Sequence, residues 1–295
     1  MILFVSGRTD IVAFYMEWFM NRYKEGFVDV RNPFNHNLVS RIKFENVDLL
    51  FFCTKNPLPI IPHLKTLKIP MLIHVTLTPY KKDIEPNVPS KKEIIEGVKR
   101  ISSIIGSDNI VVRYDPIFIS KKYSVIYHQK AFLQLCSLLK GYVHKIIVSF
   151  IDNYKNVENN MQYLKVLPFT EEIYYQIGTS FSMIAKKYDI TVQTCFENKN
   201  LVEYGFVKGD CLSKELALKL TGKNYPKQNV RKGNKCECVK MVDIGVYNTC
   251  KHLCKYCYAN YQENIVENNY LMHNPKSSML IGNLQKNDVV KERLK

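Results

Sequence analysis

Eight short apolar runs, separated by amphipathic stretches, most constrain what this chain can fold into. Most of the runs are four to eight residues long and rich in Val, Ile and Phe. Such near-continuous hydrophobicity is typical of strands buried on both faces, as in a parallel sheet. The expected strands span residues 2–6, 27–30, 47–53, 71–77, 110–114, 145–150, 190–195 and 241–246.

Helical patterns lie between these runs. Asp10 is a candidate N-cap for a helix that ends at Gly26, and residues 90–93 form a capping box for a helix that ends at Gly106. Repeated strand–helix units predict an α/β fold with a parallel sheet and right-handed crossovers. Eight strands favour a (β/α)8-type barrel, regular or irregular, over an open doubly wound sheet. Further helices are expected over residues 124–140, 170–188 and 213–221.

Composition divides the 295 residues into four parts. Residues 1–221 form the main body of the α/β barrel. Residues 222–235 form a polar loop with five positive charges and no acid. Residues 236–273 hold the closing strand and a cysteine-rich, cluster-binding segment, and residues 274–295 are a tail. We expect the apolar residues 279–281 to pack the tail against the body and its charged end to fray.

The net charge of +15 suggests a nucleic acid or another acidic partner. Only eight of the 42 basic residues are arginine, however, although base and phosphate recognition favour arginine. A solvated basic surface is therefore the simpler interpretation. No apolar run approaches the roughly 18 residues that cross a bilayer, and the N-terminus has neither the basic lead-in nor the cleavage site of a signal peptide. We expect a cytoplasmic protein without membrane contact.

Nine cysteines, seven of them from residue 195 onward, form the most informative group of side chains. An odd number in a chain without an export signal argues against a disulfide framework and favours metal binding. Cys53 and Cys136 lie apart in apolar segments, where we expect small buried hydrophobic side chains. We likewise expect His74 to be a core histidine with satisfied hydrogen bonds.

The sharpest motif is CxxxCxxC, formed by Cys250, Cys254 and Cys257. It follows the last expected strand, so it lies on a strand-to-helix loop. Three thiolates on one short loop can hold three irons of a cubane 4Fe-4S cluster and leave the fourth iron open to an exogenous chelating group. A zinc site would need a fourth ligand, for which the loop offers only His252 at an unusual spacing. The third alternative is that these thiols bind no metal.

Four other cysteines form a second candidate set. Cys195 ends an expected strand, Cys211 begins an expected helix, and Cys236 and Cys238 form a CxC pair. Four thiolates would complete a closed site, either a second 4Fe-4S cluster or a zinc site with four cysteine ligands. The alternative is that one or two of them are merely buried thiols.

Polar residues follow most of the expected strands, where parallel α/β proteins place their binding loops. Arg8 and Asp10 follow the first strand, and Arg113 and Asp115 end the fifth. An arginine at such a place can bind a carboxylate through forked hydrogen bonds. The alternative is that these residues form structural ion pairs or caps. Other polar residues at strand ends are Arg31, Asn32, Lys55, Asn56, Thr78, Tyr80, Asp152 and Glu197.

The triple-cysteine motif, with Tyr256 before its third cysteine, resembles the cluster motif of radical S-adenosylmethionine (SAM) enzymes. Nearly end to end, the chain resembles bacterial radical-SAM-like proteins of unknown function that carry this motif near the C-terminus. The resemblance rests on residues 8–11 (RTDI), 13–15 (AFY), 30–34 (VRNPF), 54–57 (TKNP), 76–80 (TLTPY), 83–86 (DIEP), 113–116 (RYDP), 236–238 (CEC), 243–245 (DIG) and 247–250 (YNTC).

This resemblance implies an enzyme that cleaves SAM reductively and abstracts hydrogen from an unknown substrate, with a flavodoxin or ferredoxin as electron donor. Radical SAM enzymes usually carry the motif after the first strand, so its place after the last strand implies a rearranged barrel. The Gly-Gly-Glu segment that binds the SAM amino group in radical SAM enzymes is not visible in this sequence. In a rearranged barrel, the resemblance implies that the loop over residues 6–10 takes its position. The candidate SAM-binding residues are Arg8, Asp10, Arg113, Asp115 and Tyr256.

Two other functions stay open at this point. The charge favours a metal-bearing protein that binds or repairs nucleic acid. The cysteines also suit an iron–sulfur protein that transfers electrons or senses redox state without SAM.

Overall fold

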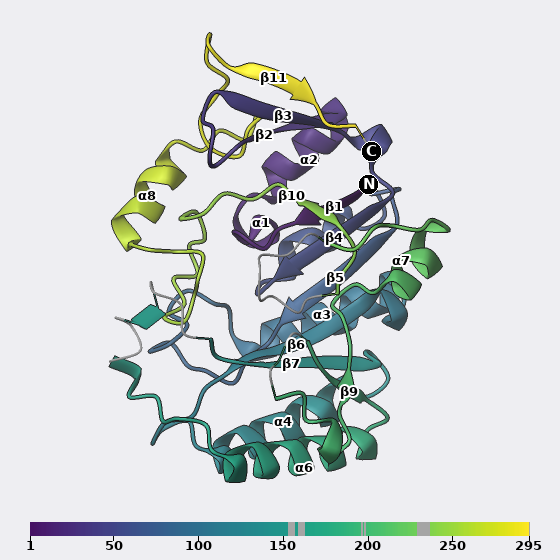
Figure 1. Ribbon diagram of the computed structural model, residues 1–295, viewed down its shortest axis with the longest axis vertical. Coiled ribbons are helices and arrows are strands. Elements are labelled where there is room, and N and C mark those ends of the chain that lie inside the picture. Colours follow the sequence, from purple (N-terminus) through teal and green to yellow (C-terminus); the bar gives the residue numbers. More distant parts are fainter. Residues whose placement is uncertain (153–156, 159–162, 196, 198, 229–236, 295) are drawn as a thin grey trace.

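A parallel sheet of eight strands forms the centre of the structure, which is a computed structural model (Figure 1). The structure describes residues 1–152, 157–158, 163–195, 197, 199–228 and 237–294. Each neighbouring pair in the sheet is parallel. In sheet order the strands are β10 (Met241–Asp243), β1 (Ile2–Val5), β4 (Leu49–Thr54), β5 (Met71–Thr76), β6 (Ile110–Ile117), β7 (Lys145–Phe150), β8 (Thr191–Thr194) and β9 (Val207–Lys208).

The strand order is that of a singly wound barrel, because the last strand β10 returns to pair with the first strand β1. The barrel is nevertheless open, since no ladder joins β9 to β10 within the described residues. The α/β class and the parallel sheet are thus confirmed, whereas the expected closed barrel is not formed. Strand β9 has only two residues, both exposed, and offers too short a ladder to close the seam.

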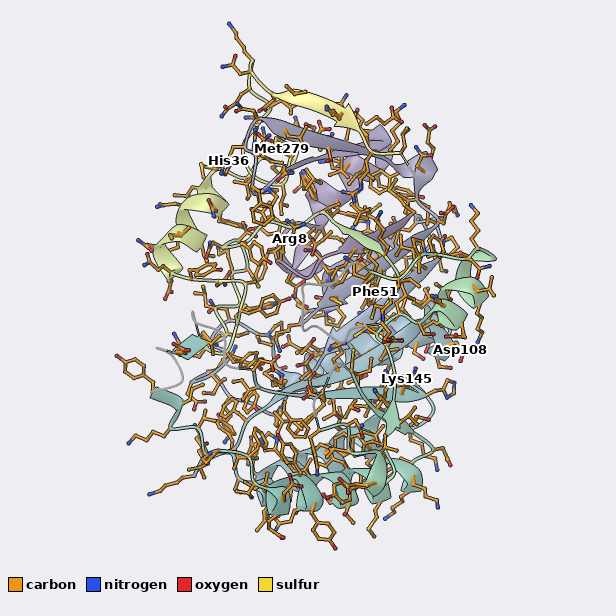
Figure 2. All side chains as sticks on the ribbon, viewed as in Figure 1. Arg8, His36, Phe51, Asp108, Lys145 and Met279 are labelled. Atoms are coloured by element: carbon orange, nitrogen blue, oxygen red, sulfur yellow. The ribbon has the colours of Figure 1, made fainter. Side chains whose placement is uncertain are left out.

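Alternating side chains along the strands produce two cores. Leu50 and Phe52 of β4 point to the outer face, where the covering helices pack. Leu49 and Phe51 point to the inner face, and Figure 2 shows Phe51 near the middle of the molecule. Ala217 of α7 (Lys214–Thr221) joins this inner core. Helix α7 therefore packs toward the inside of the open barrel.

The helices begin and end at the predicted signals. Ser90 and Glu93 form the capping box of α3, and Gly26 ends α2 in the left-handed conformation. The first predicted helix is divided at Tyr15, which separates α1 from α2. The other helices whose bounds lie within the described residues are α1 (Ile11–Phe14), α2 (Met16–Glu25), α3 (Lys91–Ile105), α4 (Val125–Leu139), α6 (Glu171–Lys187) and α8 (Glu263–Leu271), with 3-10 turns at Phe44–Asn46, Leu58–His63, Ser107–Asn109 and Val202–Tyr204.

A second sheet, in the order β11-β3-β2, lies at the top of Figure 1 beside α2. Strand β2 (Phe27–Arg31) pairs antiparallel with β3 (Leu38–Lys43), and β11 (Val289–Glu292) pairs parallel with β3. The expected strand at 27–30 is thus a strand outside the main sheet. The tail packs as predicted, because Met279 and Leu280 are buried and Met279 lies beside this sheet (Figure 2). Its charged end does not fray, since it contains β11.

None of the helices in the described part of the chain is both long and apolar enough to span a bilayer.

Candidate functional site

A cavity of about 530 Å³ lies at the carboxyl ends of the parallel strands. Polar residues that follow β1, β4, β6, β7 and β8 line it, as parallel α/β proteins generally place their binding sites. Cys53 packs against the inner core but is only partly buried and also lines this cavity, so the expectation of a small buried side chain holds only in part for Cys53. It was right for Cys136, which is fully buried in the outer core. The cysteines that line the cavity are Cys53, Cys195, Cys211, Cys238, Cys250, Cys254 and Cys257.

All three cysteines of the CxxxCxxC motif face this cavity from the loop between β10 and α8. The Cys257 amide donates a hydrogen bond to the Cys254 carbonyl at 3.0 Å, and the Asn260 side chain donates to the Cys250 carbonyl at 2.7 Å. Burial raises the pKa of all three thiols. They are therefore neutral at pH 7 unless a metal replaces their protons, as is general for thiolate ligands.

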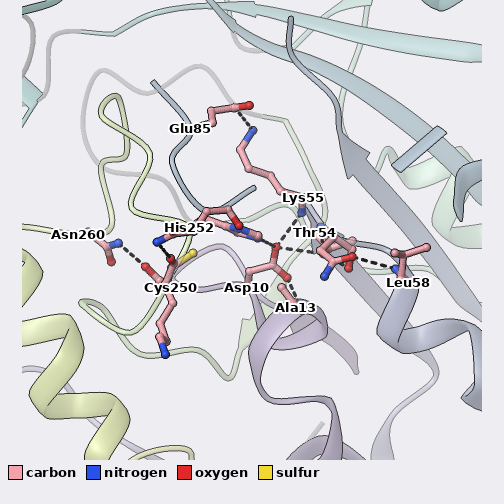
Figure 3. Close-up of polar contacts among 12 residues, drawn as sticks. Asp10, Ala13, Thr54, Lys55, Leu58, Glu85, Cys250, His252 and Asn260 are labelled. Carbon is pink, nitrogen blue, oxygen red and sulfur yellow. Dashed lines mark hydrogen bonds and ion pairs between the residues drawn. The ribbon is translucent and has the colours of Figure 1, made fainter. Parts of the chain in front are cut away.

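Asp10 and His252 fasten this loop to the first helix (Figure 3). Asp10 Oδ1 accepts the Ala13 amide at 2.9 Å and so caps α1, as predicted. Its Oδ2 lies 3.0 Å from His252 Nε2 and also accepts from the Lys55 amide at 2.7 Å and the Thr54 hydroxyl at 3.0 Å. Both oxygens of Asp10 are therefore occupied by protein partners.

Glu85 fastens the same loop from the other side. It accepts hydrogen bonds from the Tyr256 hydroxyl and the Thr78 hydroxyl, and it pairs with Lys55 and Lys91. Burial alone would raise the pKa of Glu85, but the two ammonium groups outweigh this effect and lower it to about 2. The side chain is a buried carboxylate that holds Tyr256 in place. Sequence reasoning missed this role, although residues 83–86 carry part of the family resemblance.

The loop after β1 is joined to the end of β10 through Asp243. Asp243 accepts hydrogen bonds from the Ser6 hydroxyl at 2.6 Å, the Gly7 amide at 2.9 Å and the Gly245 amide at 2.7 Å. A Cβ on Gly245 would lie 1.9 Å from Ser6 Oγ, so the close approach of these loops requires glycine there. Arg8 Nη2 donates to the Asp243 carbonyl at 2.9 Å. Arg8 thus pairs with Asp243, not with Asp10.

Arg113 and Asp115 form the ion pair that was one of the two alternatives, with a closest contact of 2.6 Å. Arg113 Nη1 also lies 2.9 Å from Cys211 Sγ, and Cys211 Sγ lies 2.9 Å from Cys195 Sγ. Hydrogen bonds with Cys195 and Cys238 lower the pKa of Cys211 well below its usual range, against the effect of burial. The structure therefore brings three cysteines of the second set together. Cys236 lies outside the described residues.

Two further titratable side chains lie close to these groups. Glu197 lines the cavity and accepts the Phe150 amide at 3.0 Å, and burial raises its pKa to about 7. His74 is fully buried, and neither ring nitrogen has a hydrogen-bond partner among the described atoms. His74 is therefore a core histidine as expected, but its ring nitrogens are not satisfied by the described residues, contrary to expectation. Burial, together with the Arg113 charge, lowers the pKa of His74 to about 3.

Residues 2–259 match a family model described as a domain of unknown function, DUF1848. The chain belongs to the DUF1848 family. No curated protein matches this DUF1848 chain, and no solved structure matches it either.

A single metal ion and a cubane cluster would require different arrangements of the thiols in this DUF1848 chain. In the described residues, no three His, Cys, Asp or Glu side chains are grouped as the ligands of a single ion. A cubane cluster makes a different demand, because each thiolate binds a different iron and the sulfur atoms stand farther apart. Cys250, Cys254 and Cys257 share one loop and line one cavity. Three thiols on one loop are the type of donor set that a cubane cluster with one open iron would use.

Proposed function

We propose that this DUF1848 chain is a radical SAM-type enzyme that uses a 4Fe-4S cluster bound by Cys250, Cys254 and Cys257. The observation that supports this most is the placement of all three thiols on one loop at the carboxyl ends of a parallel sheet, facing a cavity. Three thiolates leave one iron for a chelating ligand such as the amino and carboxylate groups of SAM. When bound, the cluster supplies the electron that cleaves SAM and generates an organic radical.

The chain's own residues orient the loop and exclude water. Asp10 and Glu85 are almost fully buried, and they hold His252 and Tyr256 of the loop from opposite sides. A site held by packed, hydrogen-bonded side chains fixes the geometry that a reaction needs. Lys55 pairs with Glu85, and its ammonium group lowers the pKa of Cys254 against the larger effect of burial. A positive charge beside Cys254 favours its thiolate form, the form that binds iron.

The part of the cavity that would contact a substrate lies at the carboxyl ends of β6, β7 and β8. Arg113, Asp115, Ser149 and Glu197 line the cavity there. The Arg113 guanidinium is already paired with Asp115 and Cys211, so it offers a fixed donor edge to a substrate. Glu197, with a pKa near 7, can donate or accept a proton at its carboxyl oxygen near neutral pH.

The test is anaerobic reconstitution with iron and sulfide, followed by iron analysis, electron paramagnetic resonance and incubation with SAM and dithionite. We expect about four irons per chain at this motif, a spectral change on addition of SAM, and formation of 5′-deoxyadenosine. The variant C250A/C254A/C257A should lose that iron and the product. The control C136A changes a buried cysteine outside the cavity and should keep both. Fully reconstituted protein that shows no spectral change and no product would overturn the proposal.

One observation favours a second candidate, an iron–sulfur protein that transfers electrons without SAM. The side chains of Arg8, Asp10, Arg113 and Tyr256, which were expected to bind SAM, all have protein partners. The same measurements separate the two functions. A reversible one-electron signal that SAM leaves unchanged would favour electron transfer, whereas cleavage of SAM would exclude it as the sole function.

A further inference from the structure

A second cavity, of about 850 Å³, lies between α3 and α4 on the outer face of the main sheet, and we call it the outer cavity. Its walls are the first turns of α3, one face of α4 and the segment 77–90 that joins β5 to α3. The lining residues of α4 recur every three or four positions, so they share one face of that helix. They are Tyr127, Ala131, Gln134, Leu135 and Leu138. The volume lies within the roughly 300–1,000 Å³ that small-molecule sites occupy.

The packing of α4 explains why this space is not filled. Helix α4 lies against α6 at the bottom of Figure 1, where the rings of Phe132 and Phe181 stack with their centroids 3.9 Å apart. Its contacts with α3 are much sparser. Ala131, in the middle of the face that lines the cavity, contributes only a methyl group. A hollow therefore remains between α3 and α4 beside the outer core.

The interior of the outer cavity is apolar. The Tyr127 hydroxyl donates to the Pro79 carbonyl at 2.8 Å, and the Tyr80 hydroxyl donates to the Pro116 carbonyl at 3.0 Å. Both hydroxyls are therefore occupied by the backbone, and the rings add to an aliphatic lining formed by Leu77, Val88, Ile95, Leu135 and Leu138. A sugar or a second charged group would be buried here at a high cost, because it would find few polar partners. A hydrocarbon would not carry this cost.

The mouth of the outer cavity carries uncompensated positive charge. Lys81 and Lys92 line it and are exposed, and within the described residues neither ammonium group has an ion pair or a hydrogen bond. Of the two carboxylates in the lining, Glu96 pairs with Lys99 at 3.0 Å, and Glu85 pairs with two lysines. An anionic group at the mouth would therefore be attracted by two lysines and would meet no unpaired carboxylate of the lining.

Glu85 separates the outer cavity from the cavity that the cysteines line. Lys55 and Tyr256, which contact Glu85 from one side (Figure 3 shows the Lys55 pair), line the cysteine cavity. Thr78 and Lys91, which contact it from the other side, line the outer cavity. The two cavities share no lining residue. A ligand of the outer cavity would therefore occupy a site of its own, away from the thiols.

We propose that the outer cavity binds a long-chain carboxylate of the fatty-acid class. Its hydrocarbon chain lies between α3 and α4, and its carboxylate pairs with Lys81 and Lys92 at the mouth. Lysine binds a single anionic group as a point charge. The lining holds no arginine and so lacks the fork that favours bidentate recognition of phosphate. Burial of the chain supplies the affinity, and the two lysines set its direction. This site does not depend on the proposed function.

The experiment is isothermal titration calorimetry of the full-length, delipidated protein with dodecanoate below its micelle concentration. We expect about one dodecanoate per chain. Dodecyltrimethylammonium, with the same chain and the opposite charge, should bind about tenfold more weakly or less, and butanoate about 100-fold more weakly or less. The variant A131W fills the cavity and should abolish binding, whereas S137W, on the exposed face of the same helix, should keep it.

A second pair of variants tests the mouth without touching the core. K81Q/K92Q should weaken dodecanoate binding about tenfold, and K130Q/K186Q, which removes two exposed lysines outside the cavity, should leave it unchanged. C250A/C254A/C257A should bind dodecanoate like wild-type protein, so this result stands even where the proposed function fails.

Four results would overturn the proposal. They are no binding of dodecanoate, equal binding of dodecanoate and dodecyltrimethylammonium, unchanged binding in folded A131W, and unchanged binding in K81Q/K92Q. Binding to phosphatidylglycerol vesicles without binding of free dodecanoate would assign the cavity to a bilayer lipid instead, and would overturn the proposal as well.

Discussion

His252 Nε2 lies 3.0 Å from Asp10 Oδ2, although the two residues are 242 positions apart. The contact joins the N-cap of the first helix to the centre of the CxxxCxxC loop. It also explains why a histidine occupies that loop, since its ring is buried and its second nitrogen lies 3.3 Å from the Asn87 carbonyl. His252 therefore links three chain segments through its two ring nitrogens. Because both nitrogens have protein partners, this role accounts for the histidine without a zinc ion.

Replacing Asp10 tests whether its contact with His252 holds the CxxxCxxC loop in place. We expect D10A to lower the free energy of unfolding by about 2–4 kcal/mol, because it removes a helix cap and leaves buried donors unpaired. D10N keeps an acceptor oxygen and should lose less than half as much. Urea unfolding of the metal-free, reduced protein measures both. If D10A unfolds at the wild-type urea concentration, Asp10 does not anchor the loop.

Glu85 allows a prediction about acid stability. Its folded pKa, about 2, lies below its ordinary value of 4.5, so its contribution is present above pH 4.5 and is lost as the pH falls from 4.5 toward 2. E85Q should cost about 3–5 kcal/mol at pH 7, because Lys55 and Lys91 would stay buried without a counterion. The surface variant E96Q, which breaks only the exposed Lys99 pair, should cost less than about 1 kcal/mol.

The comparison is made by chemical unfolding at pH 3, 5 and 7. The difference between wild-type and E85Q should shrink at the lowest pH. A constant difference across the series would show that the carboxylate charge of Glu85 is not what stabilises the loop.

For Glu197 we predict the opposite pH dependence of the free energy of unfolding. Its pKa is raised from 4.5 to about 7, so the folded state holds a proton that the unfolded chain releases. Stability is fully present below pH 4.5 and decreases as the pH rises from 4.5 through 7. E197Q should remove this decrease and gain up to about 3 kcal/mol relative to wild-type at pH 8. Parallel stability profiles of the two proteins between pH 5 and 8 would contradict the raised pKa.

Much of the fold follows from local patterns in the sequence. The strands at β1, β4, β5, β6, β7, β8 and β10 were predicted because buried parallel strands are continuous apolar runs. The caps at Ser90 and Gly26 were predicted because capping chemistry is local. The strand β9 was missed, since Val207 and Lys208 are both exposed and carry no apolar pattern. The failure of the barrel to close could not be predicted, because it depends on the length of β9.

The site was predictable only where the signal was local. The spacing of Cys250, Cys254 and Cys257 placed them on one loop, and that loop faces the cavity. Glu85 and Asp243 lie in segments that carry the family resemblance, but no local pattern indicates their partners. Their roles come from long-range contacts with Tyr256 and Ser6. Whether an arginine pairs with the aspartate two residues away could not be predicted either. Arg113 pairs with Asp115, whereas Arg8 pairs with Asp243 and not with Asp10.

The last prediction concerns β11, which the sequence analysis took for a fraying end. Asp288 precedes β11 and accepts two hydrogen bonds from Arg31, at 2.5 and 2.6 Å, while its side chain is almost fully buried. We expect D288A to release β11 from β3, because Arg31 would lose its only carboxylate partner among the described residues and the strand would lose its ion pair with β2. Amide hydrogen exchange over residues 289–292 should then quicken about tenfold or more, with exchange in β4 unchanged. The exposed control K291A should leave exchange as in wild-type, and unchanged exchange in D288A would show that backbone pairing with β3 suffices to hold the strand.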